Sequence, residues 1–98
     1  MTDQLTELQE LVLDLVVESH TAVEDIVTEV RLLMGNGVSV QQMTDALVQL
    51  REARLVNAYV CEDERGSFER YRRVKLKRGV ALWWFATAAG RAANASTS

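Results

Sequence analysis

The sequence has few of the residues that stabilise small secreted or metal-binding domains. Its 98 residues include one cysteine, Cys61, and one histidine, His20. A lone cysteine excludes an internal disulfide, and these two residues are too few for a structural zinc site. No apolar run approaches the roughly 18 to 20 residues of a membrane-spanning helix. The opening residues MTDQLTELQE are acidic, where a secretory signal is basic and then apolar. We therefore expect a cytoplasmic protein with no membrane partner.

Residues that carry catalysis are also scarce. His20 has no second histidine with which to form an acid–base pair, and its position at a predicted helix junction favours packing or capping. Cys61 lies in a predicted strand before three acidic residues, where a small packed side chain is favoured over a nucleophile. The glycine turn at residues 35–37 lacks the strand and the lysine of a phosphate-binding loop. We expect neither enzymatic activity nor a cofactor or metal site.

Charge is distributed unevenly along the chain, whose formal net charge is −3. Residues 1–64 hold 13 acidic and 3 basic residues, whereas residues 65–98 hold 8 basic residues and 1 acidic residue. Seven of those bases lie in residues 65–79, RGSFERYRRVKLKRG. Such asymmetry often marks a surface for nucleic acid or another polyanion, although a merely solvated basic hairpin would show it too.

Two amphipathic helices are predicted in the first third of the chain. Apolar residues spaced by three and four predict a helix over residues 3–18. Thr21 and Glu24 have the spacing of a capping box, and the apolar period continues from there to Leu33 and Met34. Gly35 then supplies a natural stop. The second helix is therefore predicted over residues 21–34.

A third helix follows after a short turn that contains glycine. Ser39 and Gln42 form a second S-x-x-Q capping box, which predicts a helix over residues 39–54. Two capped helices joined by such a turn have the form of a helix-turn-helix.

The rest of the chain is rich in strand-forming residues. Strands are predicted at residues 56–62, 68–76 and 80–86, with a hairpin tip near 64–67. Thr87 is the expected N-cap of a short helix at 88–93, and residues 94–98 are expected to form a flexible tail. We thus expect one α+β domain over residues 1–93.

Two stretches resemble winged-helix transcription regulators of the PadR-like and MarR-like kinds. Residues 45–56, DALVQLREARLV, are similar to a recognition helix running into the first strand of the wing. Residues 85–93, FATAAGRAA, are similar to the wing exit followed by T-x-x-G-R. The resemblance covers most of the chain. It implies a winged helix, with three helices, a β-hairpin wing and a short C-terminal helix, that binds double-stranded DNA and regulates transcription.

The resemblance assigns DNA contacts to two elements, the wing and helix 39–54. Asp45 and Glu52 on the outward face of that helix have the wrong charge for DNA, so we expect the wing to dominate binding. The wing residues expected on the DNA backbone are Arg70, Arg72, Arg73, Lys75 and Lys77. The helix residues expected at base edges are Gln41, Gln42, Thr44 and Gln49.

The alternative function is a winged helix that serves protein contacts without DNA. Trp83 and Trp84 are adjacent in a predicted strand, so their side chains point to opposite faces, and both faces of this strand are apolar. One of the two tryptophans is therefore a candidate for a homodimer or partner interface, unless helices of the same chain cover both faces. Val48, an apolar residue on a polar helix face, is a weaker indication of the same kind.

Overall fold

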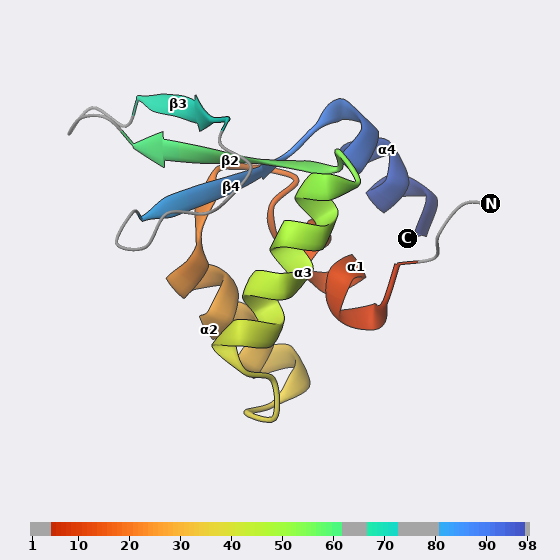
Figure 1. Ribbon diagram of the computed structural model, residues 1–98. Coiled ribbons are helices and arrows are strands. Elements are labelled where there is room, and N and C mark those ends of the chain that lie inside the picture. The colour runs from red at the N-terminus through yellow and green to blue at the C-terminus, as the bar shows by residue number, and fades with distance from the viewer. Residues whose placement is uncertain (1–4, 62–66, 73–80, 98) are drawn as a thin grey trace.

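The computed structural model describes residues 5–61, 67–72 and 81–97 (Figure 1). Within these residues the chain folds as four helices and a four-stranded antiparallel sheet of order β1-β4-β2-β3, which confirms the expected α+β class. In Figure 1 the sheet lies above α1, α2 and α3. The elements in chain order are α1 (Glu7–Leu15), β1 (Thr21–Ala22), α2 (Val23–Met34), α3 (Val40–Glu52), β2 (Val56–Cys61), β3 (Phe68–Tyr71), β4 (Leu82–Ala86) and α4 (Ala88–Thr97).

Helix α1 is shorter than the predicted helix 3–18. It begins after a capping box that was not predicted, in which Thr6 Oγ1 accepts the Gln9 N–H at 3.1 Å and Gln9 Oε1 accepts the Thr6 N–H at 2.9 Å. It ends at Leu15 because the next carbonyl, that of Val16, faces the sheet and accepts the Ala86 N–H at 2.9 Å.

The predicted capping box of Thr21 and Glu24 is wrong. Thr21 lies in β1, and its hydroxyl donates to the backbone, with the carbonyl oxygens of Ser19 at 3.0 Å and Leu15 at 3.3 Å, instead of accepting a helix N–H. α2 begins at Val23, with Ala22 as its N-cap and no side-chain hydrogen bond there. Pairing of β1 with β4 takes these two residues out of the helix.

The turn between α2 and α3 follows the prediction. Gly35 ends α2 at φ +84°, a conformation that favours glycine, and donates its N–H to the Arg31 carbonyl at 2.9 Å. Ser39 and Gln42 form the predicted capping box, with N···O distances of 3.0 and 2.7 Å. α3 ends at Glu52, two residues before the expected end.

Strand β2 lies between β3 and β4 in the sheet. It pairs with β3 as predicted, with Ala58 opposite Tyr71, and its other edge pairs with β4. The predicted strands 56–62, 68–76 and 80–86 correspond to β2, β3 and β4, although β3 ends at Tyr71, earlier than expected. The predicted tip is described only at Ser67.

Helix α4 is longer than predicted. Thr87 is its N-cap, as expected, because Thr87 Oγ1 accepts the Gly90 N–H at 3.0 Å. The helix continues to Thr97, so the expected tail at residues 94–98 is helical over its described part. Asn94 Nδ2 donates to a carboxylate of α1 at 3.2 Å, which holds this end of α4 against the body of the domain.

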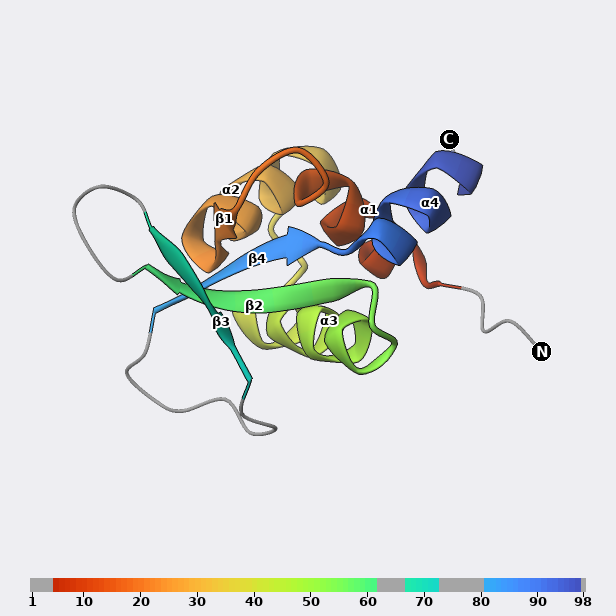
Figure 2. The same cartoon turned by 90° about the horizontal axis from the view of Figure 1, so that it is seen from above.

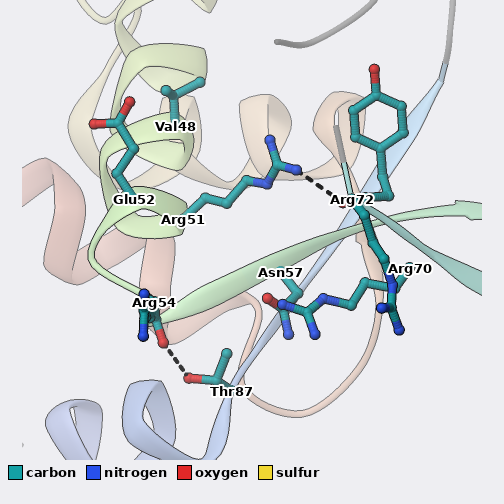
Figure 3. Close-up of a pocket in the computed structure, with 9 residues that line it drawn as sticks. Val48, Arg51, Glu52, Arg54, Asn57, Arg70, Arg72 and Thr87 are labelled. Atoms are coloured by element: carbon teal, nitrogen blue, oxygen red, sulfur yellow. Dashed lines mark hydrogen bonds between the residues drawn. The ribbon is translucent and has the colours of Figure 1, made fainter. Parts of the chain in front are cut away.

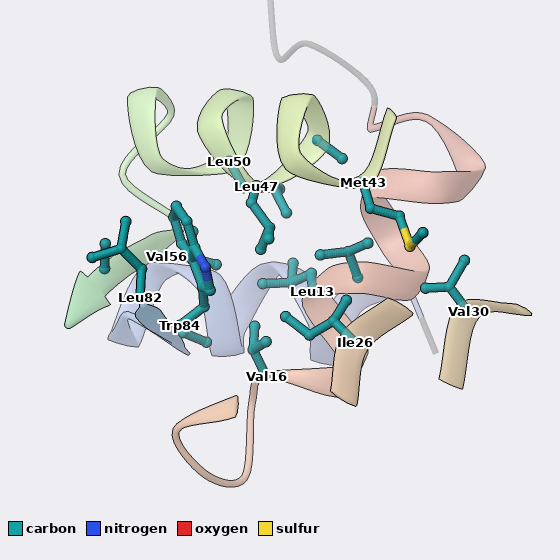
Figure 4. Packing of buried hydrophobic residues seen from close by; sticks show 14 residues of the cluster. Leu13, Val16, Ile26, Val30, Met43, Leu47, Leu50, Val56, Leu82 and Trp84 are labelled. Atoms are coloured by element: carbon teal, nitrogen blue, oxygen red, sulfur yellow. The ribbon is translucent and has the colours of Figure 1, made fainter. Parts of the chain in front are cut away.

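The hydrophobic core lies between the helices and one face of the sheet (Figure 4). Burial alternates along β4, which puts Trp84 in the core at 1% exposure and Trp83 on the opposite face, so the two indoles point apart as predicted. Leu33 and Met34 do not join the core, contrary to their expected place on the apolar face of the second helix; they are 65% and 39% exposed. The core residues are Val12, Leu13, Val16, Ile26, Val30, Met43, Ala46, Leu47, Leu50, Val56, Ala58, Leu82, Trp84 and Ala86.

Candidate functional site

Four arginine side chains surround a groove where the C-terminal end of α3 meets β2 and β3 (Figure 3). We call this the arginine groove; its volume is about 750 Å³. Within the described part of the chain, Glu52 is the one acidic residue that lines it. Among the described residues the lining is Val48, Arg51, Glu52, Arg54, Asn57, Arg70, Tyr71, Arg72 and Thr87.

Arg51 ties α3 to the edge of the sheet. Its Nη2 donates to the carbonyl oxygen of Tyr71 at 2.9 Å, drawn as a dashed line in Figure 3. Its Cζ also lies 5.5 Å from the centroid of the Tyr71 ring, a cation–π distance. Arg51 thus orients β3 relative to α3 and places a positive charge at the wall of the groove.

Arg54 is presented by an uncommon backbone conformation. It follows the end of α3 at φ +63°, a left-handed value for a residue that is not glycine. Its carbonyl oxygen accepts the hydroxyl of Thr87 at 2.8 Å, and the next N–H, that of Leu55, donates to Leu50 at 2.9 Å. The turn is therefore held at both ends, while the Arg54 side chain is exposed at the groove.

Arg70 and Arg72 supply the two charges on the β3 side. Arg70 lies opposite Tyr59 in the register and is exposed, and Arg72 follows the end of the strand, also exposed. β3 lies at the edge of the sheet as far as the chain is described, next to β2 alone. Both side chains extend near Asn57 in Figure 3. Guanidinium groups in such an arrangement suit phosphate or carboxylate ligands, which they bind through paired N–H donors.

The other predicted wing cations, Arg73, Lys75 and Lys77, lie outside the described residues. The structure thus brings Arg70 and Arg72 together with Arg51 and Arg54 of the α3 end. Those two arginines were not predicted as site residues. Their signal in the sequence was weak, since residues 1–64 hold only three basic residues and no basic run, and the approach of the α3 end to β3 is a tertiary feature.

The predicted base-reading residues of α3 do not line this groove. Gln41 is exposed and donates from Nε2 to Asp45 at 2.8 Å. The Thr44 hydroxyl donates back into its own helix, to the carbonyl one turn earlier, at 2.9 Å. Gln42 is part of the capping box of α3, and Gln49 Oε1 accepts from Gln9 of α1 at 2.6 Å. All four therefore make contacts within the chain.

The two tryptophans have different environments. Trp84 is in the core, with a buried Nε1 that has no hydrogen-bond partner among the described residues, so its side chain is not exposed on the surface of a single copy. Trp83 is half-buried on the outer face of the sheet, where its ring lies 5.2 Å from that of Phe68 at 62°. Of the two predicted interface residues, Trp83 alone remains available at the surface.

His20 is part of an aromatic cluster on this outer face. Its imidazole stacks on Phe68 at 4.2 Å and on Phe85 at 4.7 Å, and contacts Tyr59 edge-on at 4.5 Å, measured between ring centroids. Burial against these rings lowers the pKa of His20 below its ordinary value of 6.5. A packed histidine is what its position in the sequence favoured.

Two further features of the described residues bear on function. No group of three or more His, Cys, Asp or Glu side chains in this part of the chain is placed to hold a metal ion. Every helix within the same residues is too short or too polar to cross a membrane.

Comparison of the chain with protein-family models, with curated proteins and with solved structures found no match.

Proposed function

We propose that this chain is a winged-helix domain that binds double-stranded DNA and acts as a transcriptional regulator, with the arginine groove as its main contact to the DNA backbone. The observation that carries the proposal is the convergence of four arginines on one groove of an otherwise acidic protein. Phosphate groups are the ligands that such a cluster of guanidinium groups favours.

The order of the elements supports the winged-helix part of the proposal. α2 and α3 are joined by the Gly35 turn, and the strands that follow α3 are antiparallel neighbours, as in a helix-turn-helix followed by a wing. The short strand β1 between the first two helices pairs with β4 and thereby anchors the wing to the helices.

The outward face of α3 limits how DNA would be read. Asp45 and Glu52 are exposed there together with Gln41. Carboxylates repel phosphate, and Glu52 lies in the wall of the arginine groove itself. Binding should therefore depend mainly on backbone charge and vary little with sequence, with Gln41 as the best placed of the predicted base contacts.

Fluorescence anisotropy with a mixed-sequence duplex tests the proposal. If about three to five phosphates are neutralised, log K should fall with log salt with a slope of roughly −3 to −4.5. Arg72→Ala should weaken binding to every sequence and reduce that slope by about 0.9, the contribution of one phosphate. Gln41→Ala should change sequence preference and leave the slope unaltered.

Arg31→Ala is the matched control, because it removes the same charge from an exposed arginine in the last turn of α2. That turn lies at the opposite end of the molecule from β3 in Figure 1. Equal losses in Arg72→Ala and Arg31→Ala, or no binding by the unmodified protein at low salt, would overturn the proposal.

A protein-interaction role is the second candidate. It is favoured by exposed apolar side chains, among them Leu32 at 74% exposure, and by Trp83 on the outer face of the sheet. Exposed apolar groups of this size are usual at interfaces.

A further inference from the structure

Four large apolar side chains are exposed around the turn that joins α2 to α3. Leu32 is 74% exposed, Leu33 65%, Val40 48% and Met34 39%. Burying apolar side chains of this size from water is favourable, so four of them exposed around one turn indicate a surface that a partner covers.

Leu33 and Met34 form part of a second groove, of about 420 Å³, between the end of α2 and the helices α1 and α4. We call it the acidic groove, because Glu7, Glu10 and Asp14 of α1 line it and no basic residue does so among those described. Leu11 and Asn94 complete its lining. Leu33 and Met34 are thus bordered by three carboxylates, which favours an occupant that combines positive charge with apolar surface.

The arginine groove has this combination. Beside its four arginines it contains Val48 and Tyr71, and Glu52 is the one described lining residue of opposite charge. The two grooves share no residue, and they differ in sign.

One copy of the chain does not bring its own two grooves together. In Figure 1 β3 lies at the upper left and α1 at the lower right, and the two are on opposite sides again in the perpendicular view of Figure 2. Contact between an arginine groove and an acidic groove therefore requires two copies of the chain.

We propose that the arginine groove of one copy docks on the acidic groove and the exposed apolar residues of a second copy. The contact joins two different surfaces, so it is heterologous, and any assembly that does not close into a ring keeps one groove of each kind open at its ends. Association should therefore continue beyond a dimer with rising concentration. The arginine groove is also the proposed DNA contact, so DNA and a second copy would compete for it; this competition alone rests on the proposed function.

A charge exchange tests the contact without DNA. In Arg70→Glu/Arg72→Glu both grooves are acidic, and in Glu10→Lys/Asp14→Lys the acidic groove becomes basic like the other. Each variant alone should be monomeric, because every pairing of its grooves brings like charges together. An equimolar mixture should associate again, because each variant then meets the opposite charge on the other.

Light scattering after size exclusion gives the readout against the chain mass of 11.0 kDa. The unmodified protein should show masses that rise with concentration at about 20 mM salt and fall back to the monomer at about 500 mM, where the Debye length is only a few ångströms. Glu10→Gln/Asp14→Asn, which removes charge without reversing it, should weaken association at least about tenfold. Leu33→Ser should also weaken it, with no change in net charge.

Three results would overturn the proposal: a monomer at high micromolar concentration and low salt, charge-reversed variants that associate like the unmodified protein, or a mixture that stays monomeric. Circular dichroism of each variant verifies that it is folded. If a charge-reversed variant does not fold, the neutral variant Glu10→Gln/Asp14→Asn provides the test. DNA binding that persists in Glu10→Lys/Asp14→Lys while association is lost separates this contact from the proposed function.

Discussion

At the scale of single residues, Gly90 determines how closely α4 approaches the end of α3. A Cβ added to Gly90 would lie 1.9 Å from the carbonyl oxygen of Leu55, which is backbone and has no rotamer by which to move away. Gly90→Ala should therefore lower the free energy of unfolding by about 2–3 kcal/mol, as overpacking does, although alanine is the better helix former. Urea denaturation followed by circular dichroism measures this change.

Gly37→Ala is the control for that prediction. A Cβ at Gly37 meets nothing within 4 Å, and its φ is not in the left-handed region. Its free energy of unfolding should stay unchanged or rise by up to about 1 kcal/mol, since alanine restricts the unfolded chain. Equal effects of the two substitutions would contradict the close approach of α4.

His20 makes stability depend on pH in a defined direction. Because burial in the ring stack lowers its pKa in the folded state below 6.5, the unfolded chain takes up a proton first as pH falls. The contribution of neutral His20 to the free energy of unfolding is fully present above pH 6.5. It is lost as the pH falls from 6.5 to the lower pKa of the folded state. Denaturation midpoints at a series of pH values should therefore fall more steeply for the unmodified protein than for His20→Phe.

The phenylalanine variant keeps a ring against Phe68 and Phe85 and removes the titrating group, so the carboxylates contribute equally to both proteins. Parallel curves between pH 7.5 and 5 would show that His20 does not titrate within this cluster.

At the scale of elements, the start of α3 depends on a single capping box. Ser39→Ala removes the acceptor of the Gln42 N–H, and we expect a loss of about 1 kcal/mol in the free energy of unfolding. Ser39→Asp should restore most of this stability, because aspartate is also a good N-cap. A thermal denaturation series of the three proteins measures the effect, and a loss in Ser39→Asp as large as that in Ser39→Ala would argue against capping.

The helices also show which local signals predict structure. The predicted capping box of Ser39 and Gln42 is confirmed, because both partners are local and no other described segment pairs with them. Thr21 and Glu24 have an equally good spacing, yet Thr21 is a strand residue paired with β4, which lies some sixty residues further along the chain. A capping pattern therefore predicts a helix start only where no distant strand claims the same backbone.

At the scale of the whole molecule, the sheet has one face in the core and one face covered by aromatic rings. Trp84 belongs to the first and Trp83 to the second. In Trp83→Phe the remaining indole is that of Trp84, and its fluorescence should be blue-shifted and poorly quenched by acrylamide. In Trp84→Phe the remaining indole is that of Trp83, and its fluorescence should be quenched more strongly. Similar quenching constants for the two variants would be incompatible with the 1% exposure of Trp84.

The charge asymmetry is also a property of the whole molecule. The sequence separates acidic and basic halves, and the fold puts a groove of each sign on opposite sides of the domain. Arg70 and Arg72 were predictable from the basic run, whereas Arg51 and Arg54 join the groove only because α3 ends beside β3.

The sequence by itself determined the α+β class, α3 with its cap, the Gly35 stop, the strands and the N-cap at Thr87, because each follows from local periodicity or from a hydrogen bond within a few residues. Only the tertiary structure decided the two-residue strand β1, the exposure of Leu33 and Met34, the burial of Trp84 rather than Trp83, and the convergence of the four arginines. Each of these depends on which distant segment covers or pairs with a residue. That choice follows from how the helices and the sheet pack as a whole, and no local pattern records it.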